Sequence, residues 1–404
     1  MRLLLFTGKG GVGKTTSAAA TAARVASRGG KVLVVSTDPA HSLADALGAP
    51  LDARPREVAV SDGVVLHAAE VHTRALVDDA WRELRGHLRT LLHGAGVDEV
   101  AAEELTALPG VEDLLALSEV HRLADSGLWD AVIVDCGPTA ETLRLLALPE
   151  SAAGYLERLF PAHRRAVRGL LAGLAGSDQV GRWDAAADAL GRLAERLTGL
   201  RDLLTAETTS ARLVLTPEAV VAAETRRALT ALALQQIRVD GLVANRVVPD
   251  PGSARGAAAE WLRTRRREQE RVLDSVREGT ELPLRLVEHR AAEPVGSAAL
   301  AALGAELYGD DDPLAPRGTA PELRVSGGGR DLDAVYRLEI ALPLHRDAEL
   351  DLARIGDELA IAVDGRRRLI ALPAVLRRCE VVSAEAGDDG VTVAFKPDPE
   401  LWMR

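Results

Sequence analysis

Short runs of apolar residues alternate with stretches of helical periodicity through the N-terminal part of the chain. Each run has the length of a strand that is buried on both faces. The predicted strands are residues 2–6, 31–36, 64–71, 131–135, 212–215 and 238–245. Strands that alternate with helices form a mostly parallel sheet covered on both sides. We therefore predict an α/β fold for this part of the chain.

Several helices should connect these strands. Thr216, Pro217 and Glu218 offer an N-cap hydroxyl, a proline for the first turn and an early carboxylate, so we expect a helix to start there. Two regions, mainly 73–126 and 150–208, are longer than a crossover needs and carry Leu, Ala and Val three and four positions apart. We expect them to form a helical subdomain inserted beside the sheet.

The hydrophobic period changes to two near the C-terminus. Residues 309–321 are acidic and contain proline and glycine, which favours a linker. Alternate apolar residues follow, as in Tyr336, Leu338, Ile340 and Leu342. Asp364-Gly365 is typical of a hairpin turn between two strands. The predicted organisation is a first domain at 1–308, the linker, and a small all-β sandwich at 322–398.

Composition excludes several classes of protein. The 404 residues carry a formal net charge of −11, so nucleic acid is not an expected partner. No apolar run reaches the length of a membrane span, and we expect a cytoplasmic location. The chain has two cysteines, Cys136 and Cys379, which are too few for a thiolate metal site, so we expect no zinc.

Glycines and lysines gather at residues 7–14, between the first predicted strand and a helical pattern at 15–28. The sequence matches G-x-x-x-x-G-K-[ST], in which backbone N–H groups and a helix N-terminus bind phosphates. The nucleotide-binding residues expected here are Gly8, Gly10, Gly11, Val12, Gly13, Lys14, Thr15 and Thr16. Lys14 should bridge the β- and γ-phosphates of ATP, and the Thr15 hydroxyl should ligate Mg²⁺.

Lysine is rare in this chain. Among 49 basic residues it occurs only as Lys9, Lys14, Lys31 and Lys396. Two of the four lie in the phosphate loop, which suggests that the compact ammonium charge is needed at both positions.

Two carboxylates follow predicted strands. Asp135 ends an apolar strand, a pattern that holds Mg²⁺ through its water shell. Asp38 follows the strand at 31–36, at the edge where α/β sheets bind ligands. We assign Asp135 to the metal and Asp38 to orienting or deprotonating the attacking water.

Together these motifs resemble the ArsA family of ATPases, which includes arsenite-pump ATPases and factors that target tail-anchored proteins. The resemblance spans roughly residues 1–308 and rests on GKGGVGKTT at 8–16, STDPAHSLADA at 36–46 and DCGPTAETLRLL at 135–146. It implies a deviant Walker A loop in which Lys9 crosses to the phosphates of a second copy. The implied protein is a homodimer joined across its nucleotide sites, with Lys9, Lys14 and Asp38 as catalytic residues.

The resemblance also implies that Asn245, at the end of a predicted strand, contacts adenine and that Pro283 lies nearby. Residues 322–398 are similar to the Hsp20/α-crystallin-like domain that some members carry. Targeting factors of the eukaryotic type join two subunits through a Cys-x-x-Cys zinc pair. The corresponding stretch at 261–268 has no cysteine.

Three functions remain open from the sequence. The first is an Mg-ATP-dependent homodimer whose hydrolysis gates a surface for an apolar client, as in a chaperone or targeting factor, with peripheral membrane contact compatible with this role. The second is the ATPase subunit of an arsenite or metalloid efflux pump, against which the scarcity of cysteine argues. The third is a surface-organising ATPase of the ParA/MinD sort, which would need a basic patch or tail.

Overall fold

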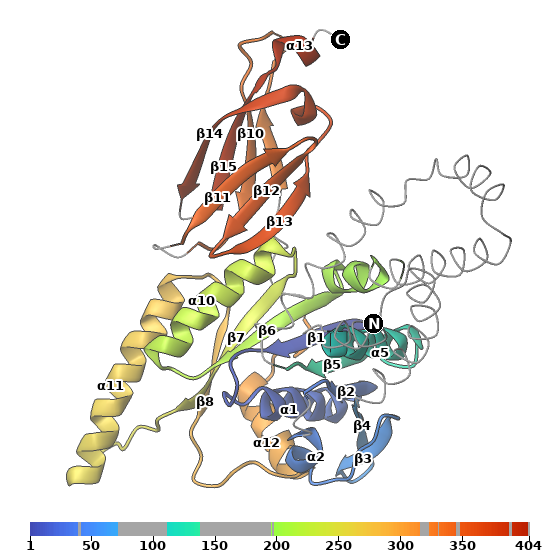
Figure 1. Ribbon diagram of the computed structural model, residues 1–404. Helices are drawn as coiled ribbons and strands as arrows, with labels where there is room; N and C mark the ends of the chain where they lie inside the picture. The colour runs from blue at the N-terminus through green and yellow to red at the C-terminus, as the bar shows by residue number, and fades with distance from the viewer. Residues whose placement is uncertain are drawn as a thin grey trace, which may run out of the picture.

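The computed structural model describes residues 1–38, 42–71, 111–137, 195, 198–315, 323–329, 331–344, 348–387 and 390–402. It shows an α/β part with a large sheet and a C-terminal part built from strands (Figure 1). None of the helices in these described ranges is long and apolar enough to cross a membrane.

An eight-stranded sheet forms the centre of the α/β part, in the order β3-β4-β2-β5-β1-β6-β7-β8. Its strands are β1 (Arg2–Thr7), β2 (Val32–Ser36), β3 (Arg56–Ser61), β4 (Val64–Glu70), β5 (Ala131–Asp135), β6 (Thr209–Leu215), β7 (Val239–Val247) and β8 (Leu284–Glu288). All neighbours are parallel except β3 and β4. The predicted mostly parallel sheet is confirmed, because the apolar runs are the buried central strands.

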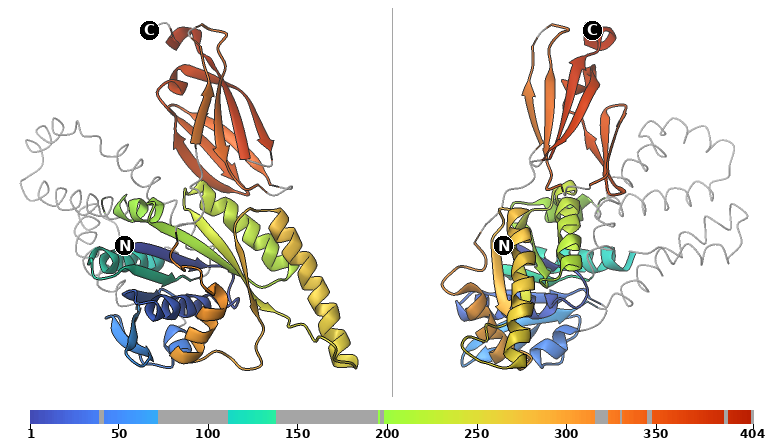
Figure 2. Two further views of the ribbon diagram at one scale, coloured as in Figure 1. Left: turned by 180° about the vertical axis from the view of Figure 1, so that it is seen from behind. Right: turned by 90° about the vertical axis from the view of Figure 1, so that its left-hand side faces the viewer.

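Helices cover both faces of this sheet (Figure 2). The described helices are α1 (Lys14–Ser27), α2 (Ser42–Leu47), α5 (Val111–Asp125), α10 (Ala219–Leu234), α11 (Ala257–Glu278) and α12 (Ser297–Tyr308). Helices α1 and α12 pack closely, since a Cβ at Gly304 would collide with the carbonyl of Ala20. Of the long helical regions expected at 73–126 and 150–208, α5 and residues 198–205 are helical, and most of the rest lies outside the described residues.

The predicted start of the helix after β6 is wrong by a few residues. Helix α10 begins at Ala219, and Glu218 is its N-cap without a side-chain capping bond. The Thr216 hydroxyl instead donates a hydrogen bond to the Glu218 carboxylate. A hydroxyl engaged in this way does not cap a helix.

The C-terminal part is a sandwich of two antiparallel sheets, in the orders β14-β15-β10-β9 and β11-β12-β13. Its elements are β9 (Leu323–Gly327), β10 (Tyr336–Ala341), β11 (Leu350–Ile355), β12 (Glu358–Val363), β13 (Arg366–Ala371), β14 (Cys379–Gly387), β15 (Gly390–Pro397), a 3₁₀ turn at Leu376–Arg378 and α13 (Pro399–Trp402). Asp364 and Gly365 both have positive φ, 50° and 74°, as the hairpin turn between β12 and β13 requires. The predicted all-β sandwich is thus confirmed.

The two parts touch through the C-terminal end of α10. Ala233 and Leu234 belong to the same apolar cluster as the sandwich core. The buried Arg368 guanidinium of β13 donates to the Leu234 carbonyl at 2.5 Å, and the Thr230 hydroxyl donates to the Pro343 carbonyl. The end of α10 therefore packs against the sandwich core.

Residues 309–315, within the segment expected to be a linker, are fastened to the α/β part. Arg28 donates to the carbonyls of Asp310 and Asp311, each at 3.1 Å. The buried Arg212 donates to the Pro313 carbonyl at 3.2 Å. Leu314 packs against the core of the α/β part.

Candidate functional site

The phosphate loop lies between the end of β1 and the start of α1. Gly8, Gly11 and Gly13 have φ values of 149°, 77° and 99°, which residues other than glycine rarely adopt. A Cβ at Gly8 would collide with the Val214 carbonyl, whereas one at Gly10 or Gly11 would meet no atom of the described residues within 4 Å. The loop is therefore packed against the sheet on one side and open on the other, where phosphates could approach its backbone.

Helix α1 supplies positive potential to this loop. Its N-cap is Gly13, which makes no side-chain capping bond. Lys14, the first helical residue, is buried, and its Nζ donates to the Lys9 carbonyl at 3.4 Å. Thr16, expected to bind nucleotide, is half-buried in the first turn. A helix N-terminus beside a buried ammonium is a strong site for an anion.

Asp135 lies at the end of β5, directly beside the loop. Its Oδ2 accepts hydrogen bonds from Thr15 Oγ1 at 2.7 Å and from Ser36 Oγ at 3.2 Å. Thr15 Oγ1 also lies 2.9 Å from Ser42 Oγ. The other oxygen, Oδ1, is buried and has no hydrogen-bond partner among the described residues.

Burial raises the pKa of Asp135 to about 6. The Thr15 hydrogen bond and the Lys14 charge lower this pKa, and the charge of Asp38 raises it again. Keeping this carboxylate ionised without a bound metal therefore costs free energy. A cation at Oδ1 would remove that cost.

These residues fit Mg²⁺ bound with a nucleotide. Mg²⁺ usually keeps several waters and takes one or two protein oxygens together with phosphates. Thr15 Oγ1 and Asp135 Oδ1 are oxygens of that kind. Within the described ranges no cluster of three His, Cys, Asp or Glu could hold a metal alone, so the phosphates would complete the set.

Asp38 follows β2 at the same edge of the sheet. Its backbone N–H donates to Ser36 Oγ at 3.2 Å, and its negative charge raises the pKa of Asp135. Residues 39–41 and 138–140, which flank the site in sequence, lie outside the described residues. The structure thus brings Asp38, Asp135, Lys14 and Thr15 together at the loop.

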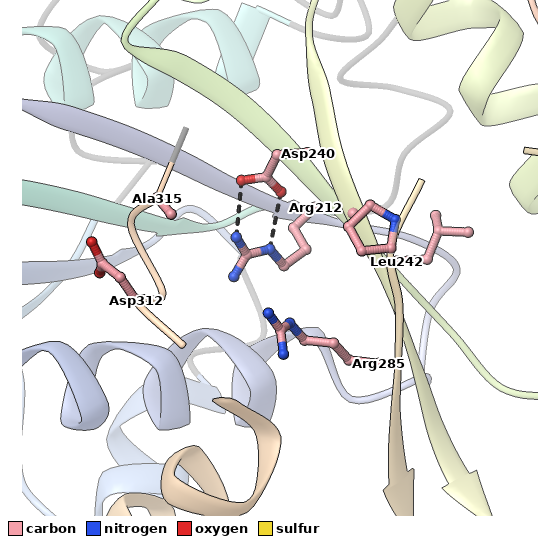
Figure 3. A pocket seen from close by; sticks show the side chains of 8 residues that line it. Arg212, Asp240, Leu242, Arg285, Asp312 and Ala315 are labelled. Atoms are coloured by element: carbon pink, nitrogen blue, oxygen red, sulfur yellow. Dashed lines mark hydrogen bonds and ion pairs between the residues drawn. The ribbon is translucent and has the colours of Figure 1, made fainter. Parts of the chain in front are cut away.

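Asn245 also reaches the loop, since its Nδ2 donates to the Val12 carbonyl at 2.8 Å and sits where a Cβ on Gly13 would point. Pro283 does not. It precedes β8 at the opposite, amino edge of the sheet, where its carbonyl accepts from Leu242 N–H at 2.9 Å. There Pro283 lines a pocket with Arg212 and Asp240, both labelled in Figure 3. This corrects its expected place near Asn245.

Lys9 pairs with a residue that the sequence reading did not single out. Its Nζ lies 3.4 Å from Glu224 Oε2 of α10, and both side chains are exposed. Ser36 and Ser42 were missed as well, although both belong to the STDPAHS stretch. The sequence does not indicate the Lys9–Glu224 pair, because the two residues are far apart along the chain and only the packing of α10 brings them together.

Comparison with known proteins gives the family of this chain. The family model described as "Anion-transporting ATPase" matches residues 1–309, and the model "HSP20-like domain found in ArsA" matches residues 333–395. Protein Rv2184c of Mycobacterium tuberculosis is 40% identical, over 99% of this chain and 97% of its own length. A putative arsenical pump-driving ATPase of Chlorobaculum tepidum is 33% identical over 98% and 96%. ATPase GET3B of Arabidopsis thaliana is 29% identical over 68% and 70%. The chain belongs to the ArsA family of ATPases and carries the HSP20-like domain found in ArsA proteins.

Proposed function

We propose that this chain is a homodimeric Mg-ATPase whose hydrolysis cycle opens and closes a surface for apolar clients. One observation carries the nucleotide chemistry. The buried Oδ1 of Asp135, which has no hydrogen-bond partner in the described part of the chain, lies beside the Thr15 hydroxyl and the open side of the glycine loop. An ionised oxygen in that position is stabilised by Mg²⁺ bound to a triphosphate.

Each residue then has a distinct task. When bound, Mg²⁺ would neutralise charge on the phosphate oxygens. Thr15 and Asp135 would hold it, Lys14 would contact the β- and γ-phosphates, and Asp38 would orient the attacking water. Lys9 would leave Glu224 and place its ammonium on the phosphates of the second copy, which couples hydrolysis to dimer closure.

Three features support an apolar client. The helical regions expected at 73–126 and 150–208 carry apolar residues at helical spacing in the sequence. Most of these two regions lies outside the described residues. The HSP20-like domain packs on α10, whose Glu224 contacts Lys9. The relative ATPase GET3B matches over 68% of this chain.

A test uses a carrier protein fused to one apolar transmembrane segment as client. We expect the Asp38→Asn variant to retain this client in Mg-ATP and the wild type to release it on hydrolysis. Lys14→Ala, which should not bind ATP, is the control. Equal retention with and without nucleotide would rule out gating.

A metalloid pump is the second candidate, because several relatives are named putative arsenical pump-driving ATPases. The two cysteines of this chain argue against it. Cys136 is buried beside Asp135, whereas Cys379 is buried in the sandwich core. Stimulation of the ATPase rate by arsenite or antimonite would favour the pump.

A further inference from the structure

The hydroxyl of Ser36 links two residues that the proposed function places in the reaction. Ser36 ends β2 and is 1% exposed, so bulk water does not compete for its hydrogen bonds. Its Oγ donates to Asp135 Oδ2 and accepts from the backbone N–H of Asp38, each at 3.2 Å. One buried hydroxyl therefore joins the carboxylate expected to hold the metal to the backbone of the residue expected to orient the water.

The single proton of this hydroxyl fixes the direction of both hydrogen bonds. A backbone N–H only donates, so the Ser36 oxygen must accept from Asp38, and its own proton is left for Asp135. Asp135 Oδ2 also accepts from Thr15 Oγ1 at 2.7 Å. Two hydroxyls thus orient this carboxylate through Oδ2, which leaves Oδ1 for the cation.

The adjacent Thr37 makes a different kind of contact with Asp135. Its N–H and its Oγ1 donate to the backbone carbonyl of Asp135, at 2.9 and 3.3 Å. These hydrogen bonds extend the parallel pairing of β2 with β5, in which Ser36 is level with Asp135. They join two main chains and do not depend on the carboxylate. The Ser36 hydroxyl, in contrast, contacts the carboxylate itself.

We infer that Ser36 is a positioning residue, which holds Asp38 at a fixed place relative to the carboxylate of Asp135. The inference rests on the proposed function, because it requires Asp38 to act on the attacking water. Without the hydroxyl, the pairing of β2 with β5 remains, but the backbone of Asp38 is no longer tied to the metal-binding side chain. A displacement of about 1 Å in an active site costs up to roughly a hundredfold in rate, so the effect falls on turnover.

Steady-state kinetics test this role. Ser36→Ala should lower kcat by about tenfold to a hundredfold, while KM for ATP stays close to that of the wild type. Unchanged affinity for a fluorescent ATP analogue shows that the variant is folded. Ser36→Thr keeps the hydroxyl and should restore most of the rate.

Ser210→Ala is the matched control. Ser210 is also a buried serine on a central strand, and it donates to the buried carboxylate of Asp240 at 2.9 Å. It lies near the start of β6, at the amino edge of the sheet and away from the phosphate loop. This variant loses the same kind of hydrogen bond and should keep the kcat of the wild type.

A double variant separates positioning from a merely structural role. Residues that act as one unit have non-additive effects on the rate. Ser36→Ala should therefore slow a single turnover of the wild type and have little effect in the Asp38→Asn background. Equal fold losses in the two backgrounds would overturn the inference. A Ser36→Ala protein with a raised KM and an unchanged kcat would also overturn it.

Failure of the inference is distinguishable from failure of the proposed function. If Asp38→Asn turns over at the wild-type rate, Asp38 does not act on the water, and both the proposed reaction and the inference fail. If Asp38→Asn is slow and Ser36→Ala is as fast as the wild type, only the inference fails.

Discussion

Among single residues, Asp135 links the protonation of the protein to its metal. Its pKa is raised to about 6, mainly by burial, and only the ionised form attracts Mg²⁺. We expect the apparent affinity for Mg²⁺ in the presence of ATP to fall as the pH drops below about 6. Titrations of a fluorescent ATP analogue with magnesium at pH 7.5 and 5.5 measure this, with EDTA samples as control. An affinity independent of pH over this interval would contradict the assignment.

The same pKa shift predicts a stability effect in the protein without nucleotide. Because the folded pKa is about 6 against an ordinary 3.8, ionised Asp135 destabilises the fold. Protonated Asp135 does not carry this cost. The stability of the protonated form is fully present below about pH 4 and is lost as the pH rises through about 6. Asp135→Asn should therefore raise the free energy of unfolding at pH 7 by up to about 3 kcal/mol. Urea denaturation at pH 7 and pH 4 tests this, and an equal gain at both would contradict it.

Asp38 is expected to act on the rate rather than on binding. Asp38→Asn should bind ATP like the wild type while turnover falls by about two to four orders of magnitude, the usual effect of losing a positioned base. Phosphate release measured beside ATP affinity separates the two effects. A rate near that of the wild type would remove Asp38 from the reaction.

The sequence predicted several of the residues that lie together at the phosphate loop and missed others for a physical reason. The loop, Thr15 and Asp135 form a local pattern fixed by strand, turn and helix, whereas Asn245 was expected from the family resemblance and contacts the loop through the Val12 carbonyl. Pro283 was misplaced because its position depends on which end of β8 it precedes. Such a fact belongs to the assembled sheet and not to the motif.

Among secondary structure elements, a buried ion pair joins β6, β7, α12 and the segment after it. Arg212 donates to both carboxylate oxygens of Asp240, at 3.0 and 2.9 Å (Figure 3), and to the Tyr308 hydroxyl at 2.6 Å. Tyr308 in turn lies 2.6 Å from the Thr21 hydroxyl of α1. Both members of the ion pair are almost completely buried, and Asp240, which also pairs with Arg2 at 3.5 Å, supplies the counter-charge of Arg212.

We expect Asp240→Ala to lower the free energy of unfolding by about 3–5 kcal/mol, since it leaves the Arg212 charge buried and unpaired. Asp274→Ala is the matched control, because it breaks an exposed pair with Arg277 on α11 and should cost less than about 1 kcal/mol. Chemical denaturation measures both. Similar losses for the two variants would show that the buried pair has no special role.

Elements with both faces buried were predicted well, and edge elements were not. The central strands read as continuous apolar runs, whereas β3 and β8 contain charged residues and lie at the two edges of the sheet. The start of α10 was shifted because the Thr216 hydroxyl bonds Glu218 instead of the helix. A competition between two local hydrogen bonds of similar strength is not decided by sequence.

In the whole molecule, α10 contacts both the nucleotide site and the sandwich. Glu224 pairs with Lys9, and Ala233 and Leu234 pack against the sandwich core further along the same helix. The helix has 16 residues, which corresponds to roughly 24 Å. The order of the two folds along the chain was predictable from the change in hydrophobic period. Their contact was not, because it depends on a few apolar residues at the end of one helix.

The most direct measurement is the molar mass of the Asp38→Asn protein in solution, by light scattering with and without Mg-ATP. We expect twice the mass of the 42.8 kDa chain with Mg-ATP. Adding Lys9→Ala should leave nucleotide bound and return the mass to that of one chain. An Asp38→Asn protein that binds Mg-ATP and stays monomeric, or a dimer that persists without Lys9, would contradict a nucleotide site shared between two copies.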